Sequence, residues 1–139
     1  MKSPDLGRRL AAEGVGSFFL FACVIGSGIM AQDLSQGNNA VALLGNTLAT
    51  GAILFVLITM LGPISGAHMN PAVSLVAAGR RELGLSEAIA YIRVQLAFGI
   101  LGAWAAHDAL HLRQIAKRLY ELAERDSGES VKYAGEWGP

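Results

Sequence analysis

Between residues 10 and 79 the chain carries only two formally charged side chains, Glu13 and Asp33. A stretch this poor in charge does not suit the surface of a soluble domain, and 53% of the whole chain is hydrophobic. Apolar runs cover residues 10–31, 40–61 and 87–106, and about 20 helical residues cross the roughly 30 Å hydrocarbon core of a bilayer. The sequence therefore predicts an all-α, polytopic membrane protein with three transmembrane helices and the lipid bilayer as a partner.

The segment 63–79 is also uncharged, but Gly, Pro, His and Asn interrupt it. We expect Gly62 and Pro63 to end the second span. Asn70 is a favoured N-cap and Pro71 suits the first helical position, so a helix is predicted to begin there and to end at Gly79. At 1.5 Å per residue this helix is roughly 13 Å long, less than half the hydrocarbon thickness. It is therefore predicted to be a re-entrant half-helix whose N-terminus points at the membrane midplane.

Basic residues predict the orientation, because Lys and Arg accumulate in short cytoplasmic loops. They precede the first span and follow the half-helix, whereas the loop 32–39 carries Asp33 and no basic residue. This pattern predicts a multi-pass protein of the plasma (inner) membrane with a cytoplasmic N-terminus. The character of the sequence changes after residue 107, where charged residues become frequent. We expect a membrane repeat over residues 1–107 and a charged tail over 108–139, the tail forming a short amphipathic helix followed by a disordered segment.

Irregular backbone at the depth of a membrane is tolerated only inside a protein or beside a wet cavity. The residues before Asn70 therefore imply a cavity. The carbonyl groups of Gly66, Ala67 and His68 are expected to supply hydrogen-bond acceptors, and the Asn70 amide and the helix N-terminus are expected to supply donors and a positive partial charge. Such a site accepts neutral hydrogen-bonding solutes and disfavours cations.

The string SGAHMNPAVS at residues 65–74 resembles the first Asn-Pro-Ala loop of the aquaporin and glycerol-facilitator family, the major intrinsic proteins. The resemblance covers roughly residues 8–107, and it extends to Ala12-Glu13-Gly14, Tyr91-Ile92, Gln95, Gly99 and Gly102. It implies a right-handed helical bundle that assembles as a tetramer with a pore in each subunit. It also implies that Glu13 is an internal hydrogen-bond acceptor that steadies the loop. The residues that the resemblance places along the pore are Asn70, Pro71, Ala72, His68, Ala67, Gly66 and Thr50.

Two features depart from the family pattern. A family pore is built from two inverted repeats, each with an Asn-Pro-Ala loop, and this sequence holds one repeat. Thr50 stands where the family more often has a bulky aromatic residue, which favours solutes larger than water. The predicted function is a membrane channel, or channel subunit, for water or small neutral solutes such as glycerol, formed as a homo-oligomer or with a second half-channel. The alternative is a truncated, non-conducting half-channel that at most assembles with full-length relatives.

Other classes of function find little support in the residues. Ser17, Ser27 and Ser74 have no evident base partner, so the chain is not expected to be an enzyme. No basic patch suggests nucleic acid, and His68 has no Cys, His or carboxylate partners for a metal, so neither a metal nor a cofactor is expected. From its position alone, Glu13 is either an interfacial carboxylate or a buried acceptor, and the family resemblance favours the second.

Overall fold

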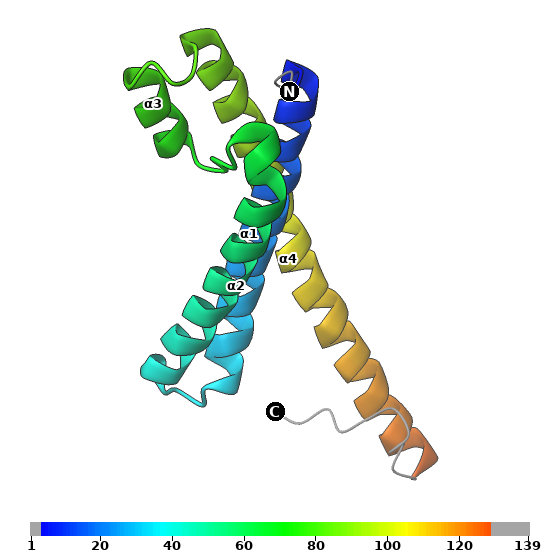
Figure 1. Ribbon diagram of the computed structural model, residues 1–139. Coiled ribbons are helices and arrows are strands. Elements are labelled where there is room, and N and C mark those ends of the chain that lie inside the picture. Colours follow the sequence, from blue (N-terminus) through cyan, green and yellow to red (C-terminus); the bar gives the residue numbers. More distant parts are fainter. Residues whose placement is uncertain (1–3, 129–139) are drawn as a thin grey trace.

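The computed structural model describes residues 4–128, which form four helices and no strand. Three of the helices are long and apolar enough to cross a membrane. This confirms the predicted all-α fold of three long helices and one short one (Figure 1). The helices are α1 (Leu6–Leu34), α2 (Asn39–Ser65), α3 (Pro71–Gly79) and α4 (Leu85–Ser127).

Asn and Asp side chains fix the start of three helices. Asp5 caps α1 by accepting a hydrogen bond from the backbone amide of Arg8 at 2.8 Å. Asn38 caps α2 and accepts from two backbone amides of the first turn. Asn70 caps α3, with Pro71 at the first helical position, as the sequence predicted. Each cap satisfies an amide that would otherwise have no partner, so the helix starts follow from local sequence.

The end of α2 differs from the prediction that Gly62 and Pro63 break the helix. The helix runs through Pro63 and ends at Ser65. Pro63 lacks only its own amide hydrogen, and the helix closes one turn later when the amide of Gly66 donates to the carbonyl of Gly62 at 2.9 Å. Gly66 itself has φ +90°, the left-handed conformation that glycine adopts at a helix end without strain. The sequence signal was therefore correct for a break but one turn too early.

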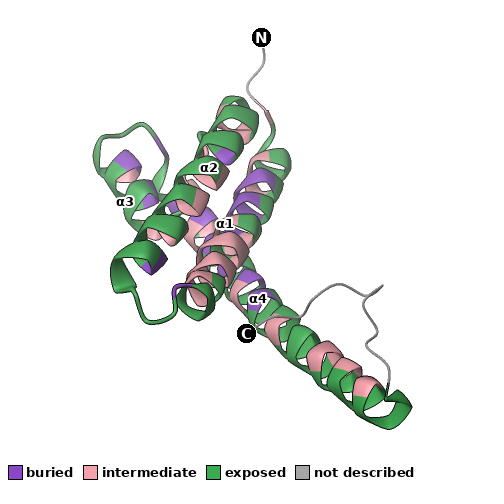
Figure 2. Ribbon diagram, turned by 90° about the horizontal axis from the view of Figure 1, so that it is seen from below, coloured by how far each residue is buried: buried purple, intermediate pink, exposed green. Residues whose placement is uncertain are grey.

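Helix α1 lies between α2 and α4, and small residues allow the close approach. A Cβ added to Gly102 of α4 would collide with the backbone carbonyl of Phe18. Farther along the same interface a Cβ on Gly26 would lie 3.7 Å from the Cβ of Ala106. Close contact through small residues is how helices associate where no hydrophobic effect drives them together. Figure 2 shows that burial is concentrated where the helices cross, while most of α4 beyond the crossing is exposed.

Helix α3 runs back toward the end of the bundle where α1 begins, and the chain then turns into α4 (Figure 1). Arg8, Arg9, Arg80 and Arg81 consequently lie at one end, and the α1–α2 connection lies at the other. Arg9 bridges α1 to α4 through an ion pair with Glu87 at 3.1 Å. The two groups of basic residues thus share one side of the bundle.

Helix α4 is longer than the predicted third span. It continues without interruption from Leu85 to Ser127, so the predicted span and the following amphipathic helix form one rod. The apolar side chains of that second part are exposed. The disordered segment predicted at the end of the tail lies, from residue 129 onward, outside the described residues.

Candidate functional site

The loop between α2 and α3 has an unusual backbone. Ala67 and Met69 have positive φ angles of 49° and 44°, a conformation that costs an L-residue roughly 1–2 kcal/mol. The Met69 side chain is almost fully buried, and a Cβ on Gly16 would lie only 2.5 Å from its sulfur atom. A loop strained in this way persists only where its surroundings hold it.

The group that holds the loop is the carboxylate of Glu13, which comes from α1 and is fully buried. One oxygen accepts hydrogen bonds from the Ser65 hydroxyl at 2.6 Å and from the backbone amide of His68 at 2.9 Å. The other accepts from the backbone amide of Met69 at 2.6 Å and from the Gln95 side chain at 2.8 Å. Four donors therefore converge on one carboxylate, which compensates for its burial.

Gln95 and Ser74 extend this network to α3 and α4. The Gln95 side-chain nitrogen donates to the Ser74 hydroxyl at 2.9 Å as well as to Glu13. The same hydroxyl lies 3.1 Å from Nδ1 of His68. All of these side chains except His68 are buried, so helices α1, α3 and α4 and the loop are joined by one polar cluster within an apolar bundle.

A second support lies next to this cluster. The Tyr91 hydroxyl donates to the carbonyl of Ser65, the last residue of α2, at 2.9 Å. It also accepts a hydrogen bond from Nε of Arg9 at 2.9 Å, and Arg9 is in turn paired with Glu87. This chain of contacts connects the charged end of the bundle to the start of the loop.

The N-terminus of α3 is the polar end of the loop. The Asn70 side-chain oxygen accepts a hydrogen bond from the amide of Ala72 at 2.8 Å. Its side-chain nitrogen has no partner among the described residues, so it remains available as a donor. The positive end of the helix dipole adds a partial charge of about half an elementary unit at the same point. Asn70 is exposed.

The backbone before Asn70 offers acceptors. The amides of Ala67, His68 and Met69 are all engaged by Ser65 or Glu13. No described residue donates a hydrogen bond to the carbonyl groups of residues 66–68. The loop therefore turns its donors into the protein and leaves three carbonyl groups free.

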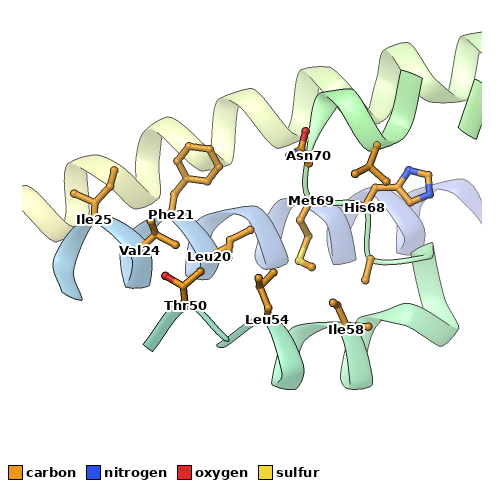
Figure 3. A pocket seen from close by; sticks show the side chains of 12 residues that line it. Leu20, Phe21, Val24, Ile25, Thr50, Leu54, Ile58, His68, Met69 and Asn70 are labelled. Atoms are coloured by element: carbon orange, nitrogen blue, oxygen red, sulfur yellow. The ribbon is translucent and has the colours of Figure 1, made fainter. Parts of the chain in front are cut away.

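A cavity of about 500 Å³ lies between the loop, α1 and α2 (Figure 3). Of the residues predicted to line a pore, Thr50, Ala67, His68 and Asn70 line this cavity, whereas Gly66, Pro71 and Ala72 are not among its lining residues. Sequence reasoning did not identify the apolar part of the wall, because nothing in an apolar run marks the face that turns inward. That wall consists of Leu20, Phe21, Val24, Ile25, Leu54, Ile58, Met69 and Val73.

Sequence reasoning also missed two polar residues next to Thr50, Asn46 and Ser27. The Asn46 side-chain oxygen accepts hydrogen bonds from the Ser27 hydroxyl at 3.0 Å and from the Thr50 hydroxyl at 3.3 Å. Asn46 lies one helical turn before Thr50, so it carries the polar surface from the cavity toward the α1–α2 connection. An Asn within an apolar span was the available signal, since such residues are rare there unless they meet a polar partner.

Comparison with known proteins identifies a matching family and several similar proteins. The model of the family described as "Major intrinsic protein" matches residues 1–131. Aquaglyceroporin AqpS of Rhizobium meliloti (strain 1021) is 52% identical over 107 residues, which are 77% of this chain and 46% of that protein.

More distant similarity extends to plants. Probable aquaporin NIP5-1 of Arabidopsis thaliana is 33% identical over 111 residues, covering 78% of this chain and 36% of that protein. Nodulin-26 of Glycine max is 33% identical over 96 residues, covering 69% of this chain and 34% of its own length. The chain thus spans half or less of the length of the curated relatives that it matches.

Proposed function

The chain belongs to the major intrinsic protein family, and on that premise we propose that it builds one half of a membrane channel for water or small neutral solutes such as glycerol. The members of this family are channels and not enzymes, as the sequence predicted for this chain. The observation that carries the proposal is the exposed Asn70 amide at the N-terminus of α3, which faces the cavity beside α1 and α2.

The chemistry of this surface suits a neutral solute. The Asn70 amide and the helix N-terminus can donate hydrogen bonds, and the free carbonyl groups of Ala67 and His68 can accept them. A water molecule or an alcohol can exchange its hydrogen bonds to bulk water for hydrogen bonds to these groups, one after another. A cation meets the positive end of α3 and is disfavoured.

The apolar wall and Thr50 bear on which solute passes. The cavity combines a few polar side chains, those of Thr50, His68 and Asn70, with a mostly aliphatic wall, a combination that suits a polyol with its hydroxyl and CH groups. Thr50 is small, so the cavity is not narrowed at that position as it would be by an aromatic residue. We therefore favour glycerol-sized solutes over water alone.

A complete pore of this kind needs a second wall. The cavity is lined by α1, α2, the loop and the start of α3, and α4 contributes nothing to it. Helix α2 carries many exposed large apolar side chains, among them Phe55 at 74% exposure. We infer that a second half-helix, from another copy, another chain or another stretch of polypeptide, faces Asn70 across the passage.

The orientation adds a constraint on that partner. Arg8, Arg9, Arg80 and Arg81 at one end support, by the positive-inside rule, our proposal that this end is cytoplasmic in a plasma (inner) membrane. An identical copy inserted in the same orientation cannot supply the inverted half. This favours a half-channel of different sequence over pairing of two copies. A non-conducting half-channel that assembles with full-length relatives is the alternative.

Stopped-flow swelling of proteoliposomes tests the proposal. The chain is reconstituted alone and together with a candidate second half, and glycerol and water permeability are measured for wild type and Asn70→Asp. Asp remains a good N-cap, so α3 keeps its start while a carboxylate replaces the amide donor. Asn38→Asp makes the same change at the cap of α2, away from the cavity, and is the matched control.

We expect permeability above that of empty liposomes in the assembly that contains the second half, a loss with Asn70→Asp and no loss with Asn38→Asp. Permeability equal to that of Asn70→Asp in every assembly would reject conduction and favour the non-conducting alternative.

A further inference from the structure

Two histidines lie one helical turn apart on α4, just beyond the last buried residue of that helix. His107 and His111 follow Ala106, and both side chains are exposed. Their ring centroids are 4.5 Å apart and the ring planes meet at 75°. The pair takes no part in the cavity or in the Glu13 network.

The spacing of the two histidines, four residues apart on one helix, is the spacing at which two imidazoles bind one metal ion. A metal–nitrogen bond of about 2.0–2.1 Å puts each ring centroid about 3.2 Å from the ion, so two ligands at a right angle have centroids about 4.5 Å apart. The observed 4.5 Å is the same separation. The centroid separation is therefore compatible with one ion bound by both rings.

A neighbouring oxygen atom orients the His111 ring, and a carboxylate lies near the His107 ring. Nδ1 of His111 lies 3.3 Å from the side-chain oxygen of Gln114, and Nδ1 of His107 lies 3.7 Å from a carboxylate oxygen of Asp108. The acceptor beside Nδ1 of His111 favours the tautomer with hydrogen on that nitrogen, which leaves the lone pair on Nε2. The Asp108 carboxylate also adds negative charge beside the pair.

We propose that His107 and His111 form a two-imidazole site for a divalent transition-metal ion of the Cu²⁺, Ni²⁺ and Zn²⁺ group. The ion bridges one turn of α4 where this helix leaves the bundle. No group of three or more His, Cys, Asp or Glu ligands exists among residues 4–128, so water completes the coordination. Imidazole selects these borderline ions, whereas Mg²⁺ and Ca²⁺ prefer oxygen ligands.

The fluorescence of Trp104 can report binding of the ion. It lies three residues before His107 and seven before His111, and therefore on the same face of α4. Bound Cu²⁺ or Ni²⁺ quenches indole fluorescence at short range. The experiment titrates each ion into full-length, tag-free protein in detergent, with Trp137→Phe as the common background so that Trp104 is the only indole.

Two variants separate chelation from loose binding to single histidines. His111→Ala removes one ligand, and the double variant Ala109→His with His111→Ala keeps the number of histidines but moves one to a different face of the helix. Positions 109 and 111 are both exposed, and circular dichroism of each variant checks that the helix content is kept.

We expect saturable quenching that is tighter for Cu²⁺ than for Ni²⁺, and no response to Mg²⁺. Loss of an outer-shell partner alone typically costs 10–100-fold in affinity, so both variants should raise the half-saturating concentration at least about tenfold. The electron paramagnetic resonance spectrum of bound Cu²⁺ should show two nitrogen ligands in the wild type. Equal affinity in the double variant, or a spectrum with one nitrogen, would overturn the proposal.

Discussion

The carboxylate of Glu13 accepts a hydrogen bond at 2.6 Å from the backbone amide of Met69, a residue held at φ +44°. A side chain near the start of the first helix thus fixes the residue directly before Asn70. Because the other three donors to Glu13 come from α2, the loop and α4, the strained loop depends on a single acceptor.

Replacing that acceptor should destabilise the whole bundle. Glu13→Gln puts an amide NH₂ among groups that are themselves donors, so at least one buried donor loses its partner. We expect the free energy of unfolding to fall by about 3 kcal/mol or more, measured by denaturant titration in micelles with circular dichroism. Glu87→Gln, at a half-exposed ion pair, should cost less than about 1 kcal/mol. Equal losses for the two variants would contradict the role given to Glu13.

The crossing of α1 and α4 should be intolerant of one added methyl group. Gly102→Ala brings a Cβ against the backbone carbonyl of Phe18, which cannot move without the helix. We expect a loss of about 1–3 kcal/mol, read as a lower midpoint of thermal unfolding. A Cβ on Gly51 of α2 meets nothing within 4 Å, so Gly51→Ala should be neutral or gain up to about 1 kcal/mol. A harmless Gly102→Ala would mean that the helices are farther apart.

The Tyr91 hydroxyl should matter more than its ring. Tyr91→Phe keeps the buried ring but leaves the Ser65 carbonyl without its donor and Nε of Arg9 without its acceptor. The expected cost is about 1–3 kcal/mol in the free energy of unfolding. Tyr120→Phe, on the outer part of α4, should change it by about 0.5 kcal/mol or less. Proteolysis within the loop, followed by mass spectrometry, should accelerate only in Tyr91→Phe.

Thr50 should govern which solute enters the cavity, if the proposed function holds. Thr50→Trp places an indole in the cavity, so glycerol permeability should fall by a larger factor than water permeability in the same proteoliposomes. Thr47→Trp puts the same side chain on an exposed part of α2 that does not line the cavity, and it should leave the ratio unchanged. An equal fall for both solutes with Thr50→Trp would contradict a size-selective role.

The parts of the fold that local chemistry determines were predictable. The apolar runs predicted three long helices, and Asn70 with Pro71 predicted where α3 begins. Pro63 was misleading, because a proline in the last turns of a helix removes one hydrogen bond without ending the helix. The length of α4 was also missed. A change from apolar to charged residues alters whether lipid or water surrounds a helix, but it does not end the helix.

The candidate site was less predictable for a physical reason. Glu13, Gln95 and Ser74 come together only through the crossing of three helices, and the residues alone left Glu13 open between an interfacial and a buried place. Periodicity marks a buried face but does not say which buried polar groups meet. The roles of Ser65 and Asn46 as hydrogen-bond partners depend on such meetings, so only the three-dimensional arrangement identifies them.

The uninterrupted course of α4 has an electrostatic consequence. Residues 107–127 extend about 30 Å along the helix axis, so with the predicted span 87–106 in the hydrocarbon core and a tilt of about 40° the far end stands about 20 Å beyond that core. Electrostatic forces are screened over about 8 Å at physiological ionic strength. We therefore expect Arg125 and Asp126 to lie outside the range of the lipid surface charge, with the helix acting as a stiff spacer that presents its last turns to the bulk solution.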